Sequence, residues 1–122
     1  MEYSWLDSYF LSKRGTRKDY QPDWQATRYF LSDKMYAMIG GDKVGSPILT
    51  LKCDPAFAEM LRVEHADIVP GYYMNKRHWN SVYLQGNVPD SVVKDMIDMS
   101  YSLVLDKLPR RAREETLSSI GD

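Results

Sequence analysis

The chain has 122 residues, the size of one domain, and ordinary shares of hydrophobic (43%) and charged (27%) side chains indicate a globular protein with its own core. Its 16 basic and 17 acidic side chains give a net charge of −1, so the basic balance typical of dedicated nucleic-acid binders is missing. The single cysteine, Cys53, excludes an internal disulfide and a cysteine-rich zinc site, and no apolar run approaches the ~20 residues that cross a bilayer.

Residues 2–13 predict a helix, because Trp5, Leu6, Tyr9 and Phe10 recur on one face of a 3.6-residue period. Gly15 follows as the expected stop. The same segment lacks a positively charged stretch followed by an apolar one, so it is not a secretory signal, and we expect a cytoplasmic protein.

Residues 16–50 change to short runs of β-forming side chains that are separated by turn signals. We expect an antiparallel meander, with one hairpin tip at Ser32-Asp33 and a longer, flexible loop at residues 40–46. Asp54-Pro55 then predicts the start of a second helix, because aspartate caps free N–H groups and proline suits the first helical position.

Residues 79–84 read as another strand, and Pro89-Asp90 opens the longest helix, which we expect to end near Leu108, before Pro109. This order predicts a two-layer α+β fold, an antiparallel sheet with helices packed on one face. We expect one domain over residues 1–109 and a polar C-terminal tail over residues 110–122.

The loop before the last predicted strand places two cations, an imidazole and an indole on consecutive residues. One interpretation is a phosphate-binding loop, with charge from Lys76 and Arg77, an amide donor from Asn75 and an aromatic face from Trp79. The other is structural, with Trp79 buried, His78 bound to a backbone carbonyl and the cations solvated or paired. The period of 2 predicts that Trp79 lies on the sheet face away from the helices, open unless other loops of the chain or a second subunit cover it.

Two further basic clusters lie near predicted helix ends, where the helix dipole favours cations without any function. They are Lys13, Arg14, Arg17 and Lys18, and Lys107, Arg110, Arg111 and Arg113. If these clusters meet the loop at residues 75–79, the combined patch can neutralise several phosphates. We therefore assign the candidate nucleic-acid site to Asn75, Lys76, Arg77, His78, Trp79, Arg14, Arg17 and Lys18.

No catalytic or metal-binding constellation stands out. Ser81 and His78 are the one nucleophile–base pair worth testing, and side chains three residues apart on a strand point to opposite faces. His65 and His78 do not match a metal spacing, so we expect neither an enzyme nor a metal or cofactor.

Several short sequence motifs, in fixed order, resemble those of the MmcQ/YjbR family of small bacterial proteins, and the resemblance runs from Trp5 to Leu108. They are Asp23-Trp24-Gln25-Ala26-Thr27, Met35-Tyr36-Ala37-Met38, Leu51-Lys52-Cys53-Asp54-Pro55, Asn75-Lys76-Arg77-His78-Trp79-Asn80-Ser81-Val82-Tyr83-Leu84, Val88-Pro89-Asp90 and Ser100-Tyr101-Ser102-Leu103-Val104.

The resemblance implies a frataxin-like two-layer α+β domain, and it implies DNA as the ligand, since family members are described as candidate DNA-binding proteins with a double-wing motif. The acidic ridge of frataxin-type iron sites is missing, because the first helix offers only Glu2 and Asp7. Two functions stay open: a non-enzymatic DNA-binding domain, and a domain that binds a protein partner or a second copy through the outer sheet face.

Overall fold

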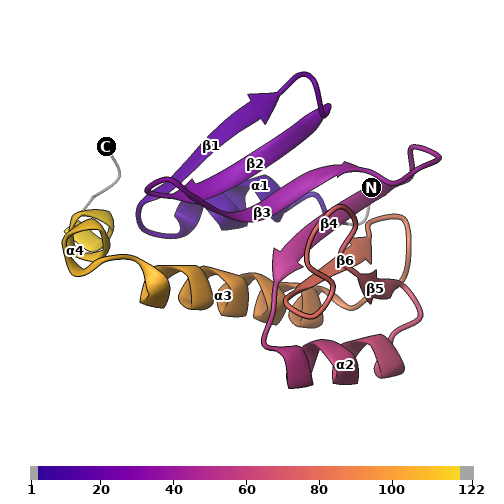
Figure 1. Ribbon diagram of the computed structural model, residues 1–122. Helices are drawn as coiled ribbons and strands as arrows, with labels where there is room; N and C mark the ends of the chain where they lie inside the picture. Colours follow the sequence, from indigo (N-terminus) through magenta and orange to yellow (C-terminus); the bar gives the residue numbers. More distant parts are fainter. Residues whose placement is uncertain (1–2, 119–122) are drawn as a thin grey trace.

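The computed structural model describes residues 3–118 as four helices and one sheet (Figure 1). In chain order the elements are α1 (Leu6–Ser12), β1 (Thr16–Gln21), β2 (Ala26–Leu31), β3 (Lys34–Gly41), β4 (Pro47–Lys52), α2 (Pro55–Glu64), β5 (Ile68–Pro70), β6 (Trp79–Tyr83), α3 (Asp90–Lys107) and α4 (Arg110–Ser118). The first helix is shorter than predicted. Asp54 caps α2 as expected, because its carboxylate accepts the Phe57 N–H at 3.3 Å.

The six strands pair in the order β1-β2-β3-β4-β6-β5, and every neighbouring pair is antiparallel. β1 to β4 form the predicted meander, with its tips at Ser32-Asp33 and at the loop of residues 42–46. An additional turn at residues 22–25 joins β1 to β2, so residues 16–52 hold four strands. The fold is therefore the predicted α+β class.

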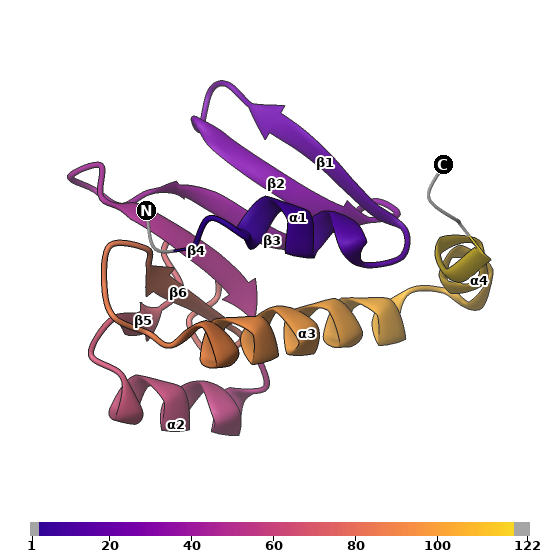
Figure 2. The same cartoon turned by 180° about the vertical axis from the view of Figure 1, so that it is seen from behind.

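Helices α1, α2 and α3 cover one face of this sheet, here called the inner face (Figure 2). Leu49 and Leu51 of β4 and Val82 of β6 point into that layer, where all three are buried in the core. Their strand neighbours Thr50 and Ser81 point to the opposite, outer face, and their hydroxyls lie 2.7 Å apart. The alternation predicted for β6 is therefore confirmed.

Helix α3 is tied to the sheet by one buried hydroxyl. Ser100 Oγ accepts the Lys52 N–H at 2.9 Å and donates to the Tyr36 carbonyl at 2.6 Å. Tyr36 lies at a bulge, where the β2–β3 pairing shifts between Tyr29 and Phe30. Lys52 lies one residue beyond the last β3–β4 pair. The hydroxyl therefore binds two backbone groups, the Lys52 N–H and the Tyr36 carbonyl, that have no partner in the strand pairing.

Residues 110–118, predicted as the start of a polar tail, form α4 and pack back against the chain after α1. Thr116 is buried, and the Leu117 carbonyl accepts Arg14 Nη1 at 3.0 Å. Gly15, with φ of +78°, allows the close approach, since a Cβ there would lie 2.5 Å from Thr116 Cγ2. The remaining residues of the predicted tail, 119–122, lie outside the described residues.

Candidate functional site

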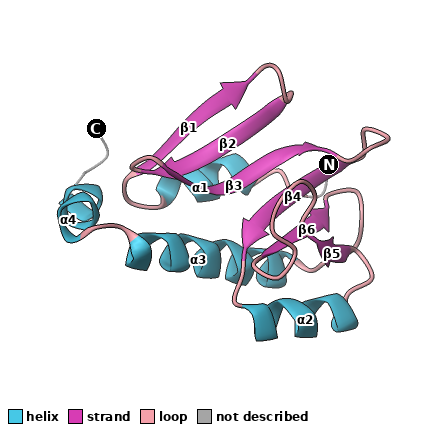
Figure 3. Cartoon of the chain, viewed as in Figure 1, coloured by secondary structure: helices cyan, strands magenta, loops and turns pink. Residues whose placement is uncertain are grey.

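The loop between β5 and β6 crosses the outer face of the sheet, on the side away from α1 and α3 (Figure 3). Its first half is bound to β6: the Gly71 N–H donates to the Trp79 carbonyl at 2.8 Å, and the Tyr72 N–H donates to Ser81 Oγ at 3.1 Å. Because Gly71 has no Cβ, its backbone can lie directly on Trp79, where a Cβ would come within 2.6 Å of Trp79 Cβ. The loop therefore leaves Trp79 half-buried.

The second half of the loop is a compact turn built by Asn75. Its side-chain oxygen accepts the N–H groups of Arg77 at 2.9 Å and His78 at 3.3 Å, which is the usual way asparagine shapes a turn. The Lys76 carbonyl accepts Arg62 Nη1 from α2 at 3.1 Å. Asn75 therefore positions the turn with its side-chain oxygen, and the side chains of Arg77 and His78 are exposed.

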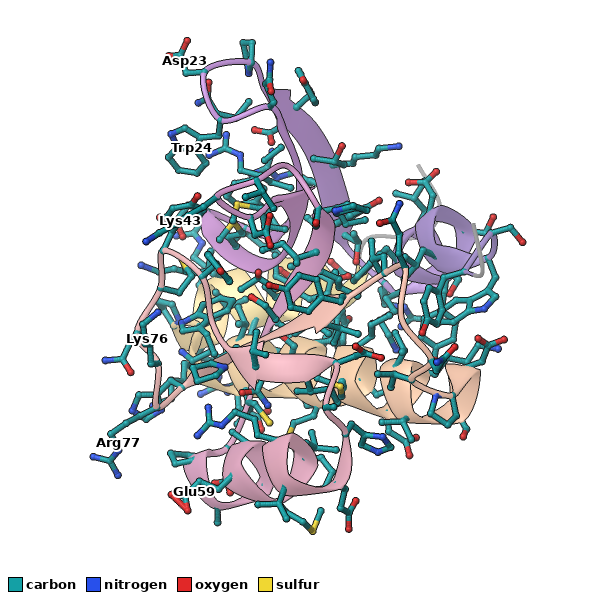
Figure 4. All side chains as sticks on the ribbon, turned by 90° about the vertical axis from the view of Figure 1, so that its right-hand side faces the viewer. Asp23, Trp24, Lys43, Glu59, Lys76 and Arg77 are labelled. Carbon is teal, nitrogen blue, oxygen red and sulfur yellow. The ribbon has the colours of Figure 1, made fainter. Side chains whose placement is uncertain are left out.

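Neither cation of this turn forms an ion pair with any carboxylate of residues 3–118. The Lys76 ammonium donates to the Gly71 carbonyl at 2.8 Å and lies 6.0 Å from the Tyr72 ring centroid. Arg77 points outward beside Lys76 in Figure 4. The turn therefore presents two uncompensated positive charges on the outer face.

The predicted basic residues near the N-terminus are placed differently. Lys18 pairs with Asp7 of α1 at 2.8 Å on the inner face, and Arg14 binds the Leu117 carbonyl of α4. Arg17 alone points to the outer face, where it donates to the Ser32 carbonyl at 2.6 Å and lies over the Phe30 ring.

The strand order separates the two groups of predicted residues. Arg17 and Lys18 belong to edge strand β1, while the turn precedes β6, four strand spacings away, or about 19 Å across the sheet. Arg14 lies beside α4. The N-terminal basic segment thus meets α4, and the structure does not bring Arg14, Arg17 or Lys18 to the loop at residues 75–79.

The outer face holds an open groove of about 1150 Å³ beside the β5–β6 loop. Phe30 of β2 and Met35 and Met38 of β3 line it from the sheet, Trp24 enters from the β1–β2 turn, and Tyr73 enters from the β5–β6 loop. Tyr73 and Trp24 are 68% and 58% exposed. Two large aromatic rings from segments far apart in the chain therefore border one hollow.

Trp24 is held in place by a chain of contacts. The Arg28 guanidinium lies 5.2 Å from the Trp24 ring and 5.0 Å from the Phe30 ring. Asp19 accepts two hydrogen bonds from Arg28, at 2.8 and 2.6 Å. This bidentate pair lowers the pKa of Asp19 and raises that of Arg28. The charge under the tryptophan is therefore balanced.

A second, smaller hollow of about 490 Å³ adjoins the groove, and Tyr73 lines both. Lys43 of the β3–β4 loop and Lys76 of the β5–β6 loop line this second hollow, together with Tyr72 and Tyr83. Neither lysine has a carboxylate partner among the described residues. Two lysines therefore border the second hollow, whereas the groove combines apolar and aromatic side chains with three carboxylates and two cations. These charged residues are Asp23, Asp33, Asp42, Arg28 and Lys34.

The phenol of Tyr83 stiffens the wall between the two loops. It donates to Asp42 Oδ2 at 3.0 Å, and the Asp42 Oδ1 atom accepts the N–H groups of Val44 and Ser46. Hydrogen bonds with Tyr72 and then with Asp42 raise the pKa of Tyr83. Because Asp42 is bound in this way, its carboxylate fixes the loop that carries Lys43.

The sequence pair Ser81–His78 does not form a catalytic dyad. Ser81 is fully buried, and its hydroxyl is engaged by Thr50 and by the Tyr72 N–H. His78 is exposed and its carbonyl accepts the Cys53 N–H at 2.7 Å. Within residues 3–118 no three His, Cys, Asp or Glu side chains gather as metal ligands. No described helix is long and apolar enough to span a membrane.

The sequence did not indicate the two exposed aromatic residues of the groove, Trp24 and Tyr73, or Lys43, one of the two lysines of the second hollow. Trp24 and Lys43 lie in polar turns, and only the fold brings these turns beside Tyr73. The one available signal was a tryptophan within a turn, Pro22-Asp23-Trp24, where burial cannot explain it.

An α+β domain with a helix-covered inner face and a grooved outer face is what the fold and the site define. The YjbR family model matches residues 11–103, and the chain belongs to this family. It is 36% identical over 114 residues to the uncharacterized protein YjbR of Escherichia coli K12, covering 93% of this chain and 96% of that protein.

Two solved structures share the architecture. The crystal structure of Deinococcus radiodurans protein DR2400 superposes with a TM-score of 0.79 at 32% identity, over 96% of this chain and 88% of that one. A crystal structure of a Pseudomonas syringae protein gives a TM-score of 0.68 at 29% identity, over 85% of this chain and 99% of that one. The arrangement of sheet and helices is therefore shared within the family.

Proposed function

We propose that the chain is a non-enzymatic DNA-binding domain that contacts phosphates through the outer face of its sheet. One observation carries the proposal: Lys76 and Arg77 stand on a hydrogen-bonded turn and have no carboxylate partner within residues 3–118, whereas Lys13 and Lys18 are paired with Asp98 and Asp7. Unpaired cations on a fixed turn lose little side-chain freedom when they meet a phosphate. The proposed ligand implies a cytoplasmic protein.

Three further cations extend this surface. Lys43 lies on the β3–β4 loop, Lys34 begins β3, and Lys52 ends β4 next to Trp79. Burial, and then the nearby charges of Lys107 and Lys34, lower the pKa of Lys52. The hairpin loops that carry Trp24 and Lys43 would serve as the two wings that the family resemblance implies.

With few phosphate contacts and a net charge of −1, the proposal predicts modest, salt-sensitive affinity. Fluorescence anisotropy with labelled duplex and single-stranded DNA, at salt from ~50 mM upward, measures both affinity and salt slope. Lys76→Ala and Arg77→Ala should each weaken binding and reduce the slope by about 1. Arg111→Ala is the matched control, since Arg111 is exposed on α4 and pairs with Glu115. Absence of binding to any DNA at ~50 mM salt refutes the proposal.

A second function, binding of a protein partner or a second copy, is favoured by a different observation. The rings of Trp24 and Tyr73 are exposed at one groove that Phe30, Met35 and Met38 also line. This function predicts a mass that rises with concentration in light scattering, or a co-purifying partner. A strictly monomeric protein without a partner contradicts it.

A further inference from the structure

We infer that the groove takes unpaired bases, so that the ligand is a single-stranded nucleic acid whose bases stack on Trp24 and Tyr73 while its phosphates follow Lys43 and Lys76. This inference rests on the proposed function and specifies its ligand. It starts from two adjacent hollows that share Tyr73: a groove bordered by the exposed rings of Trp24 and Tyr73, and a smaller hollow bordered by Lys43 and Lys76.

The groove itself suits an uncharged planar group better than a phosphate. Phe30, Met35 and Met38 line it, and the one arginine beneath Trp24 is already neutralised by Asp19. Besides Arg28, Lys34 and three carboxylates, Asp23, Asp33 and Asp42, line the groove, so a phosphate placed there would lose water and meet more negative than free positive charge. A base would instead bury apolar surface against the rings. The groove has a volume of about 1150 Å³, which leaves room for more than one base.

The backbone at Tyr73 supports a role for the exposed ring. Its φ is +63°, in the left-handed region that bulky residues rarely adopt. Glycine would occupy this position without strain, and the ring is 68% exposed, so it contributes little to the core. A strained residue with an exposed aromatic side chain at the rim of a hollow points to a contact made outside the chain.

Figure 4 shows Trp24, Lys43, Lys76 and Arg77 following one another along the side of the molecule that faces away from α1. Aromatic surface thus continues into positive surface along a single track. A single strand, with bases on one side and phosphates on the other, matches such a track, and stacking on aromatic rings tolerates any base. A duplex keeps its bases paired and offers none to these rings.

The test compares an oligothymidylate of about 12 nucleotides, the matching oligouridylate and a duplex of equal length by fluorescence anisotropy. Trp24→Ala and Tyr73→Gly should each weaken single-strand binding about 5- to 150-fold, and leave any duplex binding unchanged. Because glycine adopts this φ without strain, Tyr73→Gly should keep the fold, and a melting curve that matches the wild type checks this. Tyr20→Ala is the control, because Tyr20 is similarly exposed, at 59%, but does not line the groove.

Intrinsic fluorescence gives an independent readout, since Trp24 is the most exposed of the three tryptophans. A stacked base should quench the wild-type emission, and Trp24→Phe should abolish the quench while retaining most of the affinity. Equal or tighter duplex binding that weakens in Lys76→Ala but not in Trp24→Ala or Tyr73→Gly overturns this inference and leaves the proposed function standing. Failure of all three ligands to bind overturns both. Preference for the deoxy or the ribo strand identifies the sugar, and either supports the inference.

Discussion

The buried hydroxyl of Ser100 allows a stability prediction whose size follows from the structure. Cys53 donates its N–H to the His78 carbonyl, just before β6, so the N–H of the preceding Lys52 points the other way, toward β3, where the ladder has ended. Ser100→Ala leaves this N–H and the Tyr36 carbonyl without a partner. At about 1–3 kcal/mol for each orphaned group, and with Lys52 only partly covered, the expected loss is about 2–4 kcal/mol.

Alanine also favours the helix by about 0.5 kcal/mol over serine, which offsets part of this loss. Ser102→Ala gives the same helix gain at an exposed position of α3, so the difference between the two variants isolates the bridge. Urea unfolding followed by circular dichroism measures both free energies of unfolding. A Ser100→Ala protein that stays within about 0.5 kcal/mol of Ser102→Ala refutes the claim that this hydroxyl completes the sheet.

Three further outcomes are expected. Burial, followed by the charge of Asp54, raises the pKa of the Cys53 thiol to about 11, against an ordinary 9.0. At pH 8 the thiolate fraction is then about 100-fold smaller, so a nitrobenzoate disulfide reagent should label Cys53 only after unfolding; rapid labelling of the native protein contradicts this. The same shift means that stability falls as the pH rises from 9 toward 11. Gly71→Ala should lower the free energy of unfolding by about 1–3 kcal/mol and shift the Trp79 emission to the red, because the new Cβ would meet Trp79. An unchanged emission spectrum and melting curve would argue against that contact. Asp54→Ala should lower the free energy of unfolding by about 1 kcal/mol, with Asp54→Asn near wild type, and equal losses in both variants would contradict a capping role.

The sequence predicted those parts of the fold that depend on period and local stop signals. The alternation from Trp79 to Tyr83 assigned each side chain to the correct sheet face, since the period of 2 leaves only two choices. Asp54-Pro55 and Pro109 marked helix boundaries because their effects are local.

The parts that were not predicted depend on contacts between distant segments. β1 is an edge strand with a polar sequence, so its sequence lacks the alternation of apolar and polar residues that burial of one face produces. The segment at residues 110–118 carries one buried residue, Thr116, and its docking follows from the space that Gly15 leaves. The sequence predicted an open Trp79 ring, because it does not show that the backbone of Gly71 lies against Trp79 in the fold.

The candidate site was predicted in part for the same reason. Local sequence showed that Lys76 and Arg77 share a turn, but pairing of Lys18 with Asp7 and of Arg14 with α4 is a property of the assembled layers. Trp24 and Tyr73 likewise line one groove only because of the order of the strands, and a short stretch of sequence does not reveal that order.

The sheet separates the residues that fold the chain from those that would meet a ligand. The helices pack on one side of it, while the segments carrying Trp24, Lys43 and Tyr73 rest on the other and are joined to it mainly by backbone and hydroxyl groups. If the outer face binds the proposed ligand, changes in these segments would alter binding with little effect on the core. Grafting these three segments onto another member's sheet should transfer ligand preference without rebuilding its interior.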